Sequence, residues 1–85
     1  MIEAEQFKGW LKNNTTYSDA VIGDTVSRIK RADRILEWRD EETYQFYLEQ
    51  EKGYKALSVS VRSQLKKAVA LYRAYRASLP GAERS

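Results

Sequence analysis

The alternation of apolar and polar residues is most regular near the C-terminus, between Ser58 and Leu79. Steps of four and three positions separate a series of apolar and aromatic residues there, namely Val61, Leu65, Ala68, Tyr72, Tyr75 and Leu79. In an α-helix this spacing places all of these side chains on one side. The pattern predicts a long amphipathic helix, which Ser58 or Ser60 caps and Pro80-Gly81 ends.

A similar stripe predicts a second long helix earlier in the chain. Its apolar positions are Ile22, Val26, Ile29, Ala32 and Leu36. Ser18 is a favourable N-cap, and Asp19 in the first turn suits the positive end of the helix dipole. This helix is expected to end at Leu36.

Two shorter helices complete the prediction. The first runs from about Ile2 to Lys12, with Phe7, Trp10 and Leu11 in the core, and Asn13-Asn14-Thr15-Thr16 ends it. The other runs from about Glu41 to Glu51 after a turn at residues 37–40. Its inward residues are expected to be Tyr44, Tyr47 and Leu48, with Phe46 reaching a second side of the core and Gly53 following as the C′ residue.

No segment alternates like a β-strand for long enough to form one, and the chain contains no internal repeat. We therefore predict an all-α protein, a compact four-helix orthogonal bundle that forms a single domain over residues 1–79. Residues 80–85 are expected to be a disordered tail or the start of a linker.

Composition excludes most chemistry for this chain of 85 residues. Without cysteine it has neither disulfides nor thiolate metal sites, and without histidine it lacks the commonest general base and metal ligand. Asp40, Glu41 and Glu42 are adjacent at a helix start, where acids serve the dipole, and there is no glycine-rich phosphate loop. We expect no catalytic residues, no cofactor, no metal site and no small-molecule substrate.

The N-terminus and the hydropathy of the chain indicate the cellular compartment to expect. Its acidic N-terminus lacks the apolar run of a signal peptide, and no stretch approaches the roughly 20 apolar residues that a membrane span needs. The expectation is a cytoplasmic protein that does not bind membranes.

Charge is distributed in blocks, although the net charge is only +3. Residues 1–26 sum to −2, residues 27–36 to +3, residues 37–51 to −5 and residues 52–76 to +7. Segments of alternating charge that pair with one another would explain these blocks, and so would a surface for a polyanion. The acidic third helix should repel phosphates and orient any nucleic-acid surface away from itself.

The basic residues lie on defined sides of the two long helices. In the second helix Lys30, Arg31 and Arg34 lie roughly opposite the apolar stripe, with Arg28 at its margin. In the last helix Arg62, Lys66 and Arg73 form a flank beside the stripe, Arg76 lies on its inner edge, and Lys67 lies on the far side.

The tyrosines are interpreted mainly as structural residues. Tyr72 and Tyr75 belong to the apolar stripe of the last helix, so core packing with hydroxyls at the rim is favoured. Tyr17 and Tyr54 precede the two basic helices. There each ring either braces its loop or presents its hydroxyl to a phosphate, and we favour bracing.

Taken in order, these features resemble the N-terminal core-binding, SAM-like domain of phage integrases and other tyrosine recombinases. The resemblance is carried by the segments 7–11 (FKGWL), 17–19 (YSD), 25–31 (TVSRIKR), Tyr47-Leu48 and 63–75 (SQLKKAVALYRAY). It implies a domain that grips duplex DNA, with its second and fourth helices near the major groove. The residues that it would place near DNA are Arg28, Lys30, Arg31, Arg34, Arg62, Lys66, Lys67 and Arg73.

The resemblance also implies a separate C-terminal catalytic domain as a partner. The family's catalytic arginine, histidine and tyrosine belong to that domain, so none of the six tyrosines here is identified as the nucleophile. An alternative interpretation is a protein-interaction or dimerisation module without a nucleic-acid ligand, which would use the acidic third helix or the stripe from Val61 to Leu79.

Overall fold

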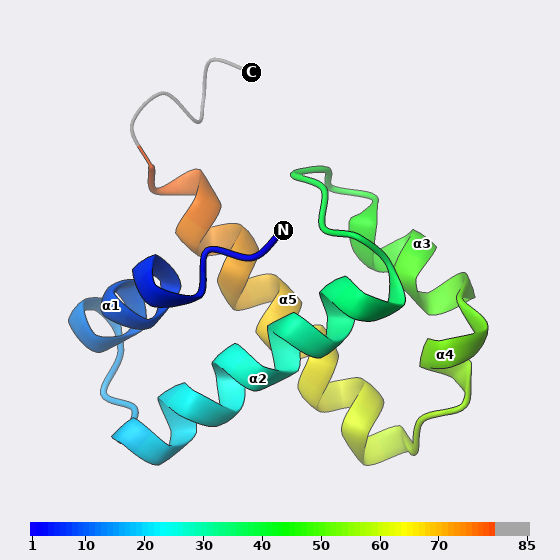
Figure 1. The fold of residues 1–85 in the computed structure, drawn as a ribbon, viewed down its shortest axis with the longest axis horizontal. Coiled ribbons are helices and arrows are strands. Elements are labelled where there is room, and N and C mark those ends of the chain that lie inside the picture. The colour runs from blue at the N-terminus through cyan, green and yellow to red at the C-terminus, as the bar shows by residue number, and fades with distance from the viewer. Residues whose placement is uncertain (80–85) are drawn as a thin grey trace.

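The computed structural model describes residues 1–79, which form five α-helices and no β-strand. The helices are α1 (Ala4–Asn14), α2 (Asp19–Ile35), α3 (Tyr44–Gln50), α4 (Lys52–Lys55) and α5 (Val59–Ala77) (Figure 1). The prediction of an all-α bundle is therefore confirmed, with α4 added as one short helical turn. The predicted tail, residues 80–85, lies outside the described residues, as does the predicted helix stop at Pro80-Gly81.

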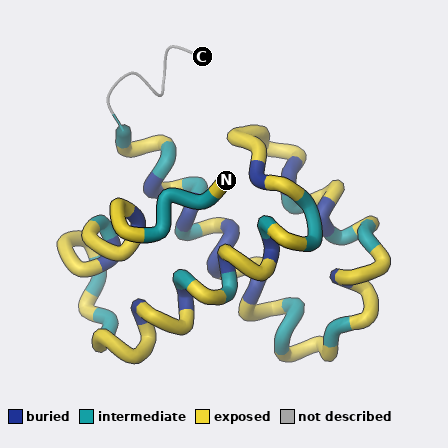
Figure 2. Tube along the Cα trace, in the orientation of Figure 1, coloured by how far each residue is buried: buried dark blue, intermediate teal, exposed yellow. Residues whose placement is uncertain are grey.

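The two long helices cross each other and form the centre of a flat molecule with principal extents of 34 × 33 × 16 Å (Figure 1). Fully buried residues such as Ile29 and Ala32 of α2 and Leu65 of α5 belong to one core between them (Figure 2). The N-cap of α2 is Ser18, as predicted, and that of α5 is Ser58, one of the two predicted serines. The Oγ atoms of Ser18 and Ser58 each accept a hydrogen bond of 3.3 Å, from the backbone N–H of Val21 and of Val61.

Helix α1 packs on both long helices through Phe7, whose ring makes an edge contact with Tyr72 at 5.0 Å between centroids. It ends at Asn14, two residues later than predicted. Asn14 Nδ2 donates to the carbonyl of Trp10, and Thr15 Oγ1 donates to that of Leu11. The helix therefore ends within the polar segment 13–16, as predicted, and these side chains satisfy carbonyl groups near its C-terminus.

The segment between α2 and α3 contributes an unexpected core residue, Trp38. Its ring is buried, 4.6 Å from Tyr44 and 4.7 Å from Tyr72 between centroids. Its backbone N–H donates to Asp33 and its Nε1 donates to Asp40, each at 2.8 Å. Both polar groups are therefore satisfied, which allows a residue of the turn to enter the core.

Helix α3 is shorter than predicted and buries fewer aromatic rings. It begins at Tyr44 rather than at Glu41, and Tyr44 and Leu48, one turn apart, are its buried residues. The inward placement of Tyr47 and Phe46 is wrong, because these side chains are 49% and 61% exposed. A helix of seven residues offers the core one narrow stripe, and residues outside that stripe remain in solvent.

The expectation that Gly53 is a C′ residue is also wrong, because it lies inside α4. An added Cβ there would lie 3.5 Å from Ile35 Cγ2, so this turn packs close to α2. The neighbouring Tyr54 is buried, and its hydroxyl donates to the carbonyl of Arg62 at 2.9 Å. The bracing role predicted for Tyr54 is confirmed.

Candidate nucleic-acid interface

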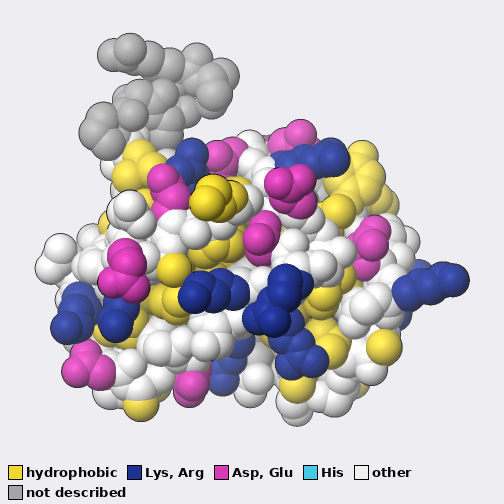
Figure 3. All heavy atoms as spheres, in the orientation of Figure 1, with side chains coloured by type: hydrophobic (Ala, Val, Ile, Leu, Met, Phe, Trp, Pro, Cys, Tyr) yellow, Lys and Arg dark blue, Asp and Glu magenta, His cyan; other side chains and the backbone are white. Residues whose placement is uncertain are grey.

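The outer face of α2 carries three exposed cations, Lys30, Arg31 and Arg34, which we call the α2 basic face. Ile29 and Ala32 of the same helix are fully buried against the core, and helix geometry turns the three cations away from them. Arg28 lies half-buried at the margin of this face, as predicted. Basic side chains gather over the middle of the molecule on the side shown in Figure 3.

No acid among residues 1–79 forms an ion pair with the α2 basic face. Within residues 1–79 the ion pairs involve only the N-terminal amino group, Lys12 and Arg76 as cations. Asp33, the acid nearest in sequence, instead accepts from the backbone N–H of Trp38 and lies 3.4 Å from the amino group of Met1. The positive charge of α2 therefore remains available to a ligand.

In α5, Arg62 and Lys66 line an open groove together with Lys55. The other side of this groove includes Glu49 and Gln50 of α3. The third helix is expected to orient any nucleic-acid surface away from itself, and its Glu49 lines the same groove as the two α5 cations. The short turn of α4 folds α3 back beside the first half of α5, which no local pattern of the sequence indicates.

The remaining α5 candidates lie apart from one another. Arg73 is half-buried farther along the flank that carries Arg62 and Lys66. Lys67 lies on another side of the helix, with its Nζ 5.8 Å from the ring centroid of Tyr17, a cation–π contact. Tyr17 is half-buried, so its ring both braces the loop before α2 and holds Lys67.

The eight predicted residues fall into two groups and three further residues. Helices α2 and α5 pack through their buried sides, so the side of α2 opposite that contact, which carries the α2 basic face, points away from α5. The structure brings together Lys30, Arg31 and Arg34 on one face, and Arg62 with Lys66 in the groove. Arg28, Lys67 and Arg73 lie at the margins of these two groups.

Arg76 is a structural cation rather than part of the candidate interface. It makes ion pairs with Glu3, before α1, and with Asp40, before α3. These hydrogen bonds and charges raise the pKa of its guanidinium above its usual value. Its predicted place on the inner edge of α5 is consistent with this network, which ties three parts of the chain together.

The tyrosine hydroxyls in the core are held in their protonated form. Burial, aided by the negative charge of Asp33, raises the pKa of Tyr44 above its usual range, and burial likewise raises that of Tyr72. Burial, the hydrogen bond that it donates to Glu3 and the charge of Glu3 raise the pKa of Tyr75 to about 12. These environments stabilise neutral phenols and do not activate a nucleophile.

Residues 1–79 contain no group of three or more His, Cys, Asp or Glu side chains arranged to hold a metal ion. None of the five helices is both long enough and apolar enough to cross a bilayer.

Comparisons with models of known protein families, with curated proteins and with solved structures gave no match.

Proposed function

We propose that this protein is a DNA-binding module that contacts duplex DNA mainly through its phosphates, with the α2 basic face at the centre of the contact. One observation carries the proposal: three exposed cations share one face of a helix, and no acid among residues 1–79 pairs with them. A face that served only solubility would gain more from mixed charges, which form pairs along a helix.

The dimensions of α2 suit this partner. Its 17 residues span about 25 Å, and the major groove, about 12 Å wide, admits an α-helix. Each cation that neutralises a phosphate releases a counterion, which favours binding at low salt. Arg31 and Arg34 carry guanidinium groups, which donate in pairs to a phosphate or to the edge of a guanine, whereas Lys30 acts as a point charge.

The α5 cations are secondary contacts in this proposal. Arg62, Lys66 and Arg73 lie on the flank of α5, and Lys67 lies on another side of that helix. A flanking stretch of the DNA backbone would reach them. The resemblance to the core-binding domain of tyrosine recombinases supports the same kind of partner. It would assign DNA cleavage and rejoining to a separate catalytic domain.

The test is fluorescence anisotropy of a labelled duplex of mixed sequence, titrated with the protein at several salt concentrations. We expect saturable binding, with a plot of log K against log salt of slope about −3 to −6, since each phosphate contact contributes about −0.9. Absence of saturable binding at low salt would overturn the proposal. Sedimentation would then show whether the protein associates with itself instead.

Two triple variants, each of which removes three positive charges, show which part of the surface contacts DNA. Replacement of Lys30, Arg31 and Arg34 by alanine should bring the salt slope about 3 units closer to zero and weaken binding at least about tenfold at low salt. The control replaces Lys8, Arg39 and Lys52, which are exposed and lie outside α2 and α5. Equal losses in the two variants would show that net charge, and not the α2 basic face, determines binding.

The double variant Lys66→Ala/Arg73→Ala measures the contribution of α5. Both side chains lie on the flank of that helix, and removing them should weaken DNA binding less than the α2 triple variant does. A larger loss from the α5 variant, with the fold intact by circular dichroism, would move the centre of the contact to α5.

A further inference from the structure

Helix α3 presents two neighbouring aromatic side chains to solvent, Phe46 and Tyr47. They are 61% and 49% exposed, and their rings meet edge to face with centroids 5.5 Å apart. Single exposed apolar residues are normal on protein surfaces, whereas adjacent aromatic rings are typical of the centres of protein interfaces. Covering such rings with a ligand removes apolar surface from water, which favours binding.

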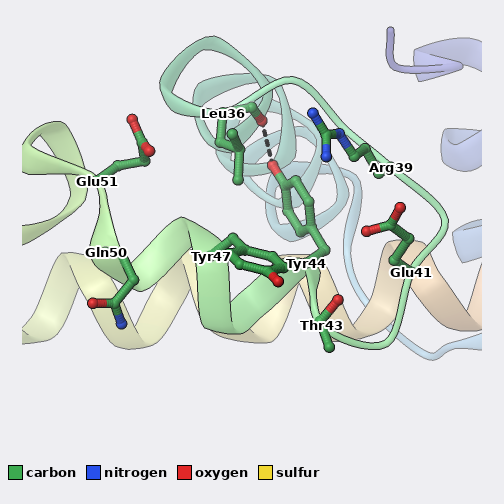
Figure 4. Close-up of a pocket in the computed structure, with 8 residues that line it drawn as sticks. All are labelled: Leu36, Arg39, Glu41, Thr43, Tyr44, Tyr47, Gln50 and Glu51. Carbon is green, nitrogen blue, oxygen red and sulfur yellow. Dashed lines mark hydrogen bonds between the residues drawn. The ribbon is translucent and has the colours of Figure 1, made fainter.

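A cleft of about 330 Å³ lies directly beside Tyr47. Its lining comes from the end of α2, the following loop and α3, and comprises Leu36, Arg39, Glu41, Thr43, Tyr44, Tyr47, Gln50 and Glu51. Figure 4 shows the Tyr47 ring in the middle, with Arg39 and Glu41 toward one end and Gln50 and Glu51 toward the other.

The cleft is held in shape by the core beneath it. The hydroxyl of Tyr44 donates to the carbonyl of Leu36 at 2.6 Å, which joins α3 to the end of α2 (Figure 4). Tyr44 is itself fully buried between the two elements. A cleft with rigid walls loses little conformational entropy when it receives a side chain.

The charge around the aromatic pair identifies the kind of ligand. Residues 37–51 carry a net charge of −5 and include one cation, Arg39. Asp40 pairs with Arg76, but Glu41 and Glu51, near opposite ends of the cleft, make no ion pair within the described chain. An apolar side chain with a cation on either side of it would match this arrangement.

We propose that the α3 face binds a basic peptide segment of another protein, in which one large apolar residue is flanked by lysine or arginine. The apolar residue of the peptide enters the cleft and packs against Tyr47. Phe46 covers the residues of the peptide that adjoin it, and the flanking cations pair with Glu41 and Glu51. In this mode of binding, a short linear peptide is anchored by one side chain that becomes buried in the complex.

A second copy of this chain fits the cleft less well. The cations of its α2 basic face lie on the side of the helix opposite Ile29 and Ala32, and these two apolar residues are fully buried. That face therefore supplies positive charge without a large apolar side chain to enter the cleft. We accordingly assign the α3 face to a different protein.

The test begins with a phage-displayed library of random 12-residue peptides, selected on the immobilised wild-type protein and depleted on the Tyr47→Ala variant. The expected result is a family of peptides with one large apolar residue and cations on both sides. Selection of no peptide family, or of a family without cations, would overturn the proposal.

Anisotropy of a labelled synthetic peptide from the selected family then measures each part of the site. Tyr47→Ala should weaken binding about tenfold, and the isosteric double variant Glu41→Gln/Glu51→Gln about fivefold or more. The double variant Glu41→Gln/Glu51→Gln keeps the shape of the surface, so it remains informative if Tyr47→Ala impairs folding. Unchanged affinity in that double variant would refute the role of charge.

Two controls separate this proposal from its alternatives. The triple variant of Lys30, Arg31 and Arg34 should bind the peptide within twofold of wild type, so the DNA contact and the peptide contact can fail independently. Sedimentation of the protein alone should show no concentration-dependent dimer. A dimer that Tyr47→Ala disrupts would assign the α3 face to a second copy and overturn the proposal.

Discussion

The sharpest test of the core is removal of the Tyr44 hydroxyl. This side chain is fully buried, and its hydroxyl donates to the carbonyl of Leu36, the residue that follows the last residue of α2. Carbonyls at a helix C-terminus lack intrahelical donors, so the tyrosine supplies a bond that the helix cannot make for itself. The substitution Tyr44→Phe removes this donor and leaves the ring in place.

The loss of stability expected from Tyr44→Phe depends on the groups that this substitution leaves without a partner. A buried acceptor that loses its donor costs about 1–3 kcal/mol, and loss of one oxygen atom adds only a small cavity. We expect the free energy of unfolding to fall by about 1–2 kcal/mol. In a domain of this size each kcal/mol lowers the melting temperature by roughly 4–8 °C.

The measurement is urea unfolding followed by circular dichroism, and Tyr47→Phe is the matched control. It removes the same atom from the same helix, but this ring is half exposed and its hydroxyl makes no hydrogen bond within the described residues. The control should change the free energy of unfolding by less than about 0.5 kcal/mol. Equal effects of the two substitutions would refute the role assigned to the Tyr44–Leu36 bond.

Two further predictions concern the long helix and alkaline pH. Ser58→Ala removes the cap of α5 and should lower the free energy of unfolding in urea by about 1 kcal/mol, whereas Ser60→Ala should change it little. A larger loss from Ser60→Ala than from Ser58→Ala would contradict the capping assignment. Burial raises the pKa of Tyr75 to about 12, above its usual value near 10, so its neutral form stabilises the fold below pH 10. The free energy of unfolding should therefore fall between about pH 10 and pH 12, and a constant value over that range would count against this.

Local sequence determined the two long helices and the placement of their charges. The stripe from Ile22 to Ala32 and the stripe from Leu65 to Tyr75 repeat with the period of one helix, and this periodicity identifies the buried side without knowledge of the partner. Capping depends on neighbours three residues away, so the sequence identified Ser18 as one cap and limited the other to Ser58 or Ser60, between which the structure selects Ser58. The exposed cations of α2 follow from the same periodicity.

Contacts between distant residues decided the rest. Arg76 pairs with Glu3 and Asp40, which lie 73 and 36 positions away, and no local pattern indicates such partners. Trp38 enters the core by packing against a distant residue, Tyr72 of α5, and Tyr47 remains outside because Tyr44 and Leu48 already fill the space under α3.

The same division applies to the candidate surfaces. The sequence by itself identified which residues of α2 and α5 are basic and on which side of each helix they lie. The packing of the two helices decided that the α2 basic face points away from α5, and the position of α3 decided that Glu49 shares a groove with Arg62 and Lys66. Helix periodicity is set by the backbone of one segment, whereas the direction in which each helix faces depends on how all of them bury their apolar sides together.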